Sequence, residues 1–161
     1  MKTGLLCSAG RYANTNLYHH PLTFYQAIKG ATMKFSIQSK ARTQMIDITP
    51  AVQEAVDKAG VTDGAVMVFS PHTTAGITIN ENADPSVPAD LEMILERMIP
   101  WEANYRHLEG NSAAHAKSSL VGASELVIIE KGRLVLGTWQ SIFFCEFDGP
   151  RRRNVRLRFL S

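Results

Sequence analysis

Residues 132–160, GRLVLGTWQSIFFCEFDGPRRRNVRLRFL, carry the patterns that decide the fold class. Near their end, VRLRF at 155–159 alternates apolar residues with arginines, the period of a half-buried strand. The continuous apolar run IFF at 142–144 is typical of a strand buried on both faces. The sequence DGP at 148–150 is typical of a turn. The stretch therefore predicts consecutive β-strands joined by a turn.

Upstream segments carry the same kinds of pattern. Two of them alternate apolar and polar residues and are predicted to form a β-hairpin, namely residues 33–38 and 44–48. The other strand-like segments are apolar runs at 65–69, 77–79, 126–129 and 134–136. A turn at Lys131-Gly132 joins the last two. The chain is therefore rich in strands that meet through turns.

Two helices interrupt these strands. The first is predicted from a Thr49 N-cap followed by Pro50, with apolar residues at helical spacing up to Gly60. The second carries an apolar stripe over 91–98, with Asp84 or Ser86 as its cap. Residues 101–118 lack a period and are predicted to be a long irregular connection. The order ββαββαβββ favours an α+β fold with a mainly antiparallel, barrel-like sheet and two helices.

Composition excludes several classes of protein. The chain has 161 residues and is 45% hydrophobic, enough for one core, and no segment approaches the roughly 18 consecutive apolar residues of a membrane span. A net charge of +2 argues against nucleic acid or a membrane surface as partner. Cys7 and Cys145 lack paired spacing, which argues against a disulfide scaffold and favours a reducing, cytoplasmic setting. Cys145 lies in an apolar run and is predicted to be buried and inert.

The first 32 residues differ from the rest of the chain. They hold three basic residues and no acid, without a periodic apolar pattern. Their Leu5-Leu6-Cys7 cluster is too short for a secretory signal. Residues 1–32 are therefore predicted to be an extension that is disordered or not native, with Met33 as an alternative start. Residues 33–161 are predicted to form a single domain.

Three histidines of this domain lie in polar segments: His72 in SPHTTAG, His107 in NYRH and His115 in GNSAAH. One such histidine is ordinarily a solvated loop residue. Three together match the ligand number of a catalytic metal site that keeps one position open. Their sequence spacing is only moderately specific, because it differs from the tight HExxH register.

Two polar clusters leave alternatives open. The run NENADP at 80–85 suits either helix capping or oxygen ligands for a phosphate-bound Mg²⁺. The arginines at 151–153 suit either a solvated rim or a phosphate site, because guanidinium forks bind phosphate bidentately. Gly137 allows either close approach of a ligand or a bulge. Trp139 and Phe147 are predicted to be core residues.

Three motifs in this order resemble the YjbQ family of small bacterial and archaeal proteins, also described as secondary thiamine-phosphate synthases. They are SPHTTAGITINENADPSV at 70–87, YRHLEGNSAAHAKSSLVG at 105–122 and GRLVLGTWQSIFFCEFDGPRRR at 132–153. The resemblance covers residues 33–161 and implies a β-rich α+β fold, a homotrimer and a metal-binding active site. It implies thiamine-phosphate synthesis, in which a pyrimidine methyl diphosphate joins a thiazole phosphate and diphosphate leaves.

The resemblance also implies roles for matching positions. The metal ligands would be His72, His107 and His115, holding a divalent ion such as Zn, Mn, Ni or Mg. The catalytic group would comprise Glu146, Glu81 and Asn111. The substrate and phosphate would contact Thr73, Thr74, Gln140, Arg151 and Arg153. The same residues would suit a metal-dependent hydrolase, or a non-catalytic trimeric binding protein for a phosphorylated metabolite.

Overall fold

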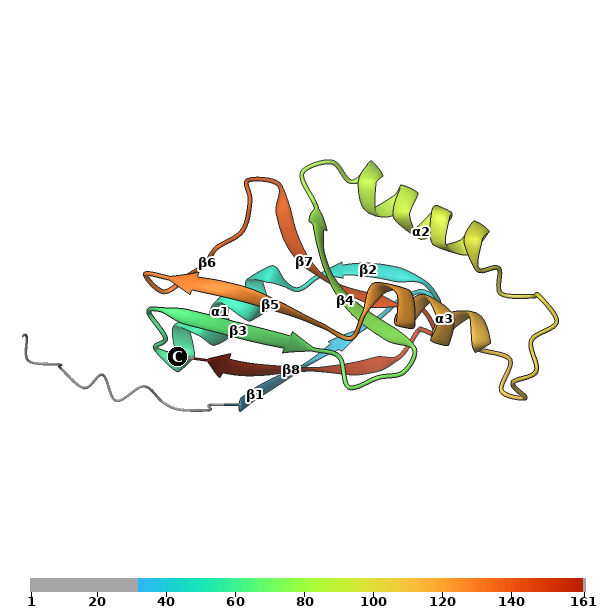
Figure 1. Cartoon of the computed structure of the whole chain (residues 1–161), viewed down its shortest axis with the longest axis horizontal. Helices are drawn as coiled ribbons and strands as arrows, with labels where there is room; N and C mark the ends of the chain where they lie inside the picture. Colours follow the sequence, from blue (N-terminus) through green and yellow to red (C-terminus); the bar gives the residue numbers. More distant parts are fainter. Residues whose placement is uncertain (1–31, 161) are drawn as a thin grey trace, which may run out of the picture.

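A five-stranded antiparallel sheet forms one layer of the fold (Figure 1). A computed structural model describes residues 32–160, and all statements about the structure refer to these residues. The strand order in this sheet is β1 (Thr32–Gln38), β8 (Arg152–Leu160), β3 (Gly64–Phe69), β5 (Ser124–Glu130) and β6 (Arg133–Leu134). The long strand β8 pairs with both β1 and β3, and its alternating sequence buries one face and exposes the other.

A second, three-stranded sheet packs over the inner face of the first. Its order is β2 (Gln44–Asp47), β7 (Gln140–Glu146) and β4 (Ala75–Glu81). The three helices described are α1 (Thr49–Ala59), α2 (Ser86–Met98) and α3 (Ser112–Val121). The α2 and α3 helices lie at the same end of the molecule (Figure 1).

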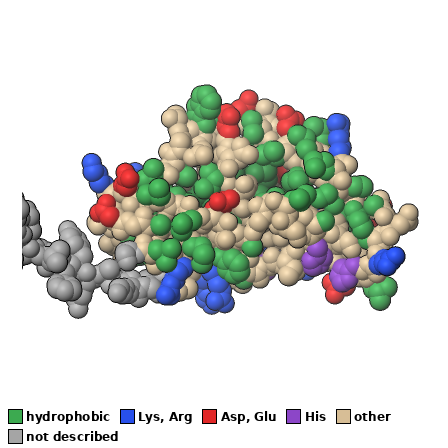
Figure 2. Space-filling view, in the orientation of Figure 1, with side chains coloured by type: hydrophobic (Ala, Val, Ile, Leu, Met, Phe, Trp, Pro, Cys, Tyr) green, Lys and Arg blue, Asp and Glu red, His purple; other side chains and the backbone are tan. Residues whose placement is uncertain are grey.

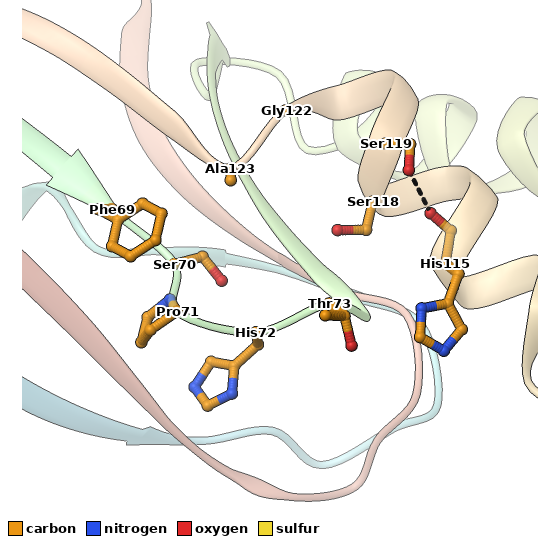
Figure 3. A pocket seen from close by; sticks show the side chains of 10 residues that line it. All are labelled: Phe69, Ser70, Pro71, His72, Thr73, His115, Ser118, Ser119, Gly122 and Ala123. Carbon is orange, nitrogen blue, oxygen red and sulfur yellow. Dashed lines mark hydrogen bonds between the residues drawn. The ribbon is translucent and has the colours of Figure 1, made fainter.

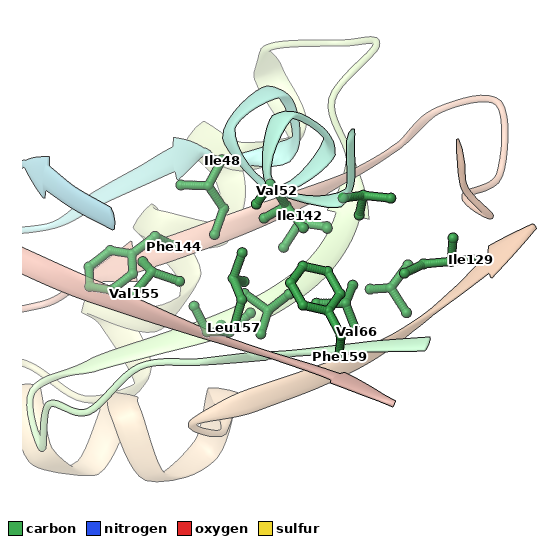
Figure 4. Packing of buried hydrophobic residues seen from close by; sticks show 14 of the residues in the cluster. Ile48, Val52, Val66, Ile129, Ile142, Phe144, Val155, Leu157 and Phe159 are labelled. Atoms are coloured by element: carbon green, nitrogen blue, oxygen red, sulfur yellow. The ribbon is translucent and has the colours of Figure 1, made fainter. Parts of the chain in front are cut away.

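The main core lies between the two sheets and α1 (Figure 4). The large sheet contributes Leu157 and Phe159 of β8, the small sheet contributes Ile142 and Phe144 of β7, and α1 contributes Val52. Each of these side chains is at most 1% exposed. Since each fully buried apolar side chain contributes about 1.5–3 kcal/mol, this cluster fixes how the two sheets stack.

A smaller core covers the other side of the three-stranded sheet. Phe143 and Cys145 point to this side of β7 and pack with Phe147, Ala114 of α3 and Leu95 of α2. The β7 strand is therefore buried on both faces, as its continuous apolar sequence predicts. This small core holds α3 against the sheet, which places His115 beside the loop that follows β3.

The α1 helix begins one residue earlier than its sequence pattern suggests. Ile48, rather than Thr49, occupies the N-cap position. The Asp47 carboxylate accepts the Thr49 backbone N–H at 2.9 Å, and the Thr49 hydroxyl instead accepts the N–H of Ile142 at 2.8 Å. Gly60 ends the helix with a positive φ of 65°, which glycine adopts without strain. At α2, Pro85 occupies the N-cap position predicted for Asp84 or Ser86, and the Asp84 carboxylate accepts the N–H of Ser86.

The α+β class and the antiparallel pairing are confirmed, but three further local predictions are wrong. The segments 33–38 and 44–48 form no hairpin, because β1 pairs with β8 and β2 pairs with β7 in the other sheet. A third helix, α3, occupies part of the connection expected at 101–118. The strand expected at 134–136 shrinks to the two residues of β6.

The prediction about residues 1–32 falls almost entirely outside the described residues. Only Thr32 is described, as the first residue of β1, where its hydroxyl accepts a hydrogen bond from Arg158. Within residues 32–160, no helix is both long enough and apolar enough to cross a membrane. The prediction that Cys145 is buried is confirmed.

Candidate functional site

A pocket of about 660 Å³ opens between the loop after β3 and helix α3 (Figure 3). One wall is the segment Phe69–Thr73, and the other is formed by one face and the end of α3. Two imidazoles belong to the lining, His72 on the loop and His115 on the helix, and they stand on opposite sides of the opening. The lining from α3 and its end consists of His115, Ser118, Ser119, Gly122 and Ala123.

Strand β8 holds the 70–74 loop in place through two hydrogen bonds. The backbone N–H of Asn154 donates to Nε2 of His72 at 2.9 Å. The neighbouring Arg153 donates from Nη2 to the Thr74 hydroxyl at 2.8 Å. Two successive β8 residues therefore hold the residues on either side of Thr73, and Thr73 itself lines the pocket.

A buried ion pair between Arg153 and Glu146 fixes the position of the arginine that binds Thr74. Arg153 is 6% exposed and Glu146 is fully buried. Their contact is bidentate, with Nε to Oε2 at 2.7 Å and Nη2 to Oε1 at 2.6 Å. The Ser39 hydroxyl and the backbone N–H groups of Phe147 and Asp148 donate further bonds to the carboxylate. Burial acts to raise the pKa of the Glu146 carboxyl, but these hydrogen bonds and the Arg153 charge outweigh it, so its pKa lies below the usual value.

His72 carries a shifted pKa as well. Partial burial lowers the pKa of its imidazole below the ordinary value, and the positive charge of Arg153 lowers it further. No Asp, Glu, Lys or Arg belongs to the pocket lining that the structure describes. The two imidazoles are therefore the ionisable side chains of the described lining.

His107 stands outside this pocket but beside it. Its ring lies 5.4 Å from the ring of His115, nearly perpendicular to it, and 3.7 Å separates its Nε2 from the Glu109 carboxylate. A smaller recess of about 460 Å³ is lined by His107, Ser112, His115, Ala116 and Ser119. His115 thus borders both hollows, and histidine side chains show at the α3 end in Figure 2.

The predicted three-histidine metal centre is wrong for the described residues. Among residues 32–160, no three His, Cys, Asp or Glu side chains come close enough together to hold a metal ion. The geometry of His72 gives a reason. Its Nε2 lone pair already accepts the Asn154 N–H, so the proton of the neutral ring is on Nδ1 and neither nitrogen offers a free lone pair. The donor set therefore does not fit the implied divalent ion.

The predicted phosphate-binding arginines are both engaged with protein acceptors. The Arg153 fork is committed to Glu146 and Thr74, as described above. Arg151, which is more exposed, donates to the Asp148 carbonyl at 2.6 Å and to its carboxylate at 2.7 Å. Asn111, predicted to be catalytic, precedes α3 and donates to the same Asp148 carboxylate at 3.1 Å.

Glu81 and Gln140 lie far from the pocket. They form a cross-strand pair at one end of β4 and β7, whereas Ala75 and Glu146 pair at the other end. Glu81 lies six positions along the strand from Ala75, a span of about 20 Å. The predicted site residues therefore do not form one site. Thr74, Glu146 and Arg153 lie together near His72, whereas Glu81 and Gln140 lie at the other end of the small sheet. Trp139, predicted to be core, is 64% exposed beside Gln140, whereas the prediction for Phe147 is confirmed.

Sequence reasoning missed several residues of the pocket. Ser118 and Ser119 face it from a helix that was expected to be a loop. Their hydroxyls donate to the carbonyls of Ala75 and His115. Ser39, which binds the buried carboxylate, belongs to a segment expected to be a hairpin turn. No sequence signal marked these serines, since hydroxyl residues are common on ordinary loops.

Comparison with known proteins identifies relatives of this chain. A family model described as "UPF0047 protein YjbQ-like" matches residues 33–161. UPF0047 protein YugU of Bacillus subtilis is 54% identical over 125 residues, covering 77% of this chain and 95% of that protein. UPF0047 protein MJ1081 of Methanocaldococcus jannaschii is 53% identical over 127 residues, covering 79% and 92%.

Solved structures agree in fold. An uncharacterized conserved protein of the YjbQ/UPF0047 family from Clostridium acetobutylicum has a TM-score of 0.78 and 53% identity, covering 80% of this chain and 99% of that one. A YbjQ-like protein of unknown function from Sulfolobus solfataricus has a TM-score of 0.79 at 29% identity, covering 83% and 98%.

These comparisons also correct the predicted activity. The descriptions of the family model and of the relatives are those of UPF0047 proteins, and the Sulfolobus structure is described as a protein of unknown function. They give no support to thiamine-phosphate synthase or to metal binding. Both predictions are therefore wrong, and the chemistry of the site has to be argued from its own residues.

Proposed function

The chain belongs to the YjbQ-like UPF0047 family, and from that premise we propose that it binds a small phosphorylated molecule in the pocket between the 70–74 loop and α3. The observation that supports this is that His72 and His115 lie on opposite sides of a pocket whose described lining carries no carboxylate. Imidazole N–H and hydroxyl groups donate hydrogen bonds to phosphate oxygens. The described lining has no Asp or Glu side chain that would repel a negatively charged phosphate.

The proposed contacts differ from those expected of an arginine-centred site. Because the Arg153 fork is held by Glu146, its role is to fix the loop, and the direct donors would be His72, Thr73 and His115. A pocket of about 660 Å³ falls within the usual range for small-molecule sites. The proposed ligand is therefore a metabolite-sized phosphate ester or diphosphate.

Calorimetric titration with inorganic diphosphate tests the proposal. We expect saturable binding, and we expect His115→Ala to weaken it about tenfold, the effect of losing one hydrogen bond to a charged group. His107→Ala is the matched control, since it removes a neighbouring imidazole that lies outside this pocket. Equal loss in both variants, or no binding by the unaltered protein, would contradict the proposed site.

Assembly into a homotrimer is part of the same proposal. The α2 helix has no buried residue in the described chain, and Met93, Ile94 and Met98 are exposed on it. Hydrophobic side chains reach the surface along α2 in Figure 2. Such an apolar helix face is typical of one covered by a partner. Light scattering should give three times the chain mass, and Ile94→Glu should reduce it, whereas a monomeric unaltered protein would contradict the trimer.

A reducing, cytoplasmic setting completes the proposal. It is supported by Cys145, a free and buried thiol, in the described part of the chain.

A further inference from the structure

The hydrogen bond between Asn154 and His72 determines what His72 can offer to a ligand. A backbone N–H is only a donor, so the Nε2 atom that it contacts at 2.9 Å must be unprotonated. A neutral imidazole carries its one proton on the other nitrogen. The backbone of β8 therefore selects one of the two tautomers of this ring.

We infer that His72 presents a fixed Nδ1–H donor to the pocket and so selects a ligand that places a hydrogen-bond acceptor, such as a phosphate oxygen, against it. This inference rests on the proposed function for the identity of the ligand, but the tautomer itself is a property of the free protein. It also explains why the ring does not serve as a metal ligand. A metal would need a lone pair that Asn154 already uses on Nε2 and that the proton occupies on Nδ1.

The surroundings of His72 favour the same neutral form. The Arg153 guanidinium lies beside the loop, where it binds Thr74 and Glu146, and its charge opposes protonation of the ring. The ring of Phe144 packs edge-on against His72, with centroids 6.5 Å apart. These contacts hold the ring in one orientation and limit its hydration. His107, by contrast, carries no such backbone bond among the described contacts.

Heteronuclear NMR of the ligand-free protein tests the tautomer directly. Long-range 1H–15N correlation spectra distinguish protonated from unprotonated ring nitrogens. At neutral pH we expect a single Nδ1–H tautomer for His72 and an averaged pattern for the control ring of His107. A protonated Nε2 in His72, or averaging between its tautomers, would overturn the inference whether or not any ligand binds.

Two substitutions separate the two ring nitrogens. In His72→Gln the side-chain amide reaches the position of Nε2, so its oxygen can still accept the Asn154 N–H while the donor near Nδ1 is lost. In His72→Asn the amide occupies the position near Nδ1, so the donor is kept while the acceptor is lost. In titrations with inorganic diphosphate, we expect His72→Gln to weaken binding about tenfold more than His72→Asn.

The outcomes distinguish the two proposals. The opposite order of the variants, with both folded by circular dichroism, would overturn the donor role of His72. If the NMR spectra show the expected tautomer but diphosphate does not bind the unaltered protein, the phosphate-binding function fails and the tautomer stands.

Discussion

Residue Arg153 sits at the junction between the core and the pocket. It neutralises the buried Glu146 carboxylate and also holds the Thr74 hydroxyl. Desolvating two charges is costly, and the bidentate geometry together with the hydrogen bond from Ser39 offsets that cost. The arginine thereby couples the stability of the fold to the position of the loop that carries His72.

Replacing Arg153 by methionine should strongly destabilise the protein. The Glu146 carboxylate would remain buried without its partner, so we expect a loss of about 3–5 kcal/mol in the free energy of unfolding. Urea denaturation measures this loss. Arg152→Met is the matched control, because Arg152 is the exposed neighbour on the same strand. A double variant, Arg153→Met with Glu146→Leu, should recover much of the loss, and equal effects in the two single variants would contradict the account.

The shifted pKa of His72 makes stability depend on pH in a defined direction. Because its pKa is lowered in the folded protein, the unfolded chain binds the proton more readily. The associated stability is fully present above about pH 6.5, the unfolded pKa, and is lost as the pH falls through the folded pKa. Unfolding free energies measured across this range should have a smaller slope in His72→Gln than in the unaltered protein. An unaltered slope in His72→Gln would contradict the assignment.

The orientation of Arg153 was readable from the sequence, although its partner was not. It shares the phase of Val155, Leu157 and Phe159 in the alternating strand, so it points inward with them. The run of three arginines instead suggested a common surface. Glu146 lies only seven residues before Arg153, but it could not be identified as the partner because their contact depends on how the intervening turn leads the chain from one sheet to the other.

At the scale of elements, a partly buried ion pair joins α2 to α3. Lys117 of α3 is fully buried, and its ammonium group contacts the Glu96 carboxylate of α2. The ammonium holds the pKa of the Glu96 carboxyl below its usual value, despite the opposing effect of burial. This contact supplements the apolar packing of Leu95, because most of α2 remains on the surface.

The two partners of this pair should respond differently to substitution. Glu96→Ala leaves a buried ammonium without its partner and should cost about 2–3 kcal/mol of unfolding free energy. Lys117→Met replaces the ammonium by an apolar chain of similar length and should cost much less. Chemical denaturation of both variants checks the asymmetry. A larger loss in Lys117→Met would mean that the ion pair itself stabilises the contact between α2 and α3.

The missed helix and the wrong hairpin have separate physical causes. The α3 helix buries small or polar side chains, Ala113, Ala114, Lys117 and Ser118, so it shows no stripe of large apolar residues. The hairpin prediction assumed that strands close in sequence pair with each other. Here Ser39 leads the chain from one sheet to the other, held by backbone and side-chain bonds to Arg151. By contrast, α1 and β8 were predictable because their periodic patterns are complete.

For the whole molecule, residues 33–160 should be sufficient for the fold. Every residue of the two described core clusters lies in that range. The matched family model also begins at Met33. We expect a chain that starts there to melt within a few degrees of the full chain, a change of less than about 1 kcal/mol in a protein of this size. A much lower melting temperature in calorimetry would show that residues 1–32 contribute to stability.

The separation of the predicted site residues also belongs to this scale. The sequence motifs placed Glu81 and His72 only nine residues apart, but the extended β4 strand carries Glu81 to the opposite end of the small sheet. Motif order identified the family correctly. It did not show which polar residues share a site, because that depends on the direction in which each strand runs.

Cys145 makes the attachment of the helices measurable. Burial raises the pKa of its thiol to about 12, and its side chain lies beneath α3 in the smaller core. Only a thiolate reacts readily with alkylating reagents, so the closed protein should be almost inert. A chain beginning at Met33 has Cys145 as its single cysteine. The rate at which Cys145 is alkylated would then measure how often α2 and α3 separate from the small sheet, which is a local opening of the fold.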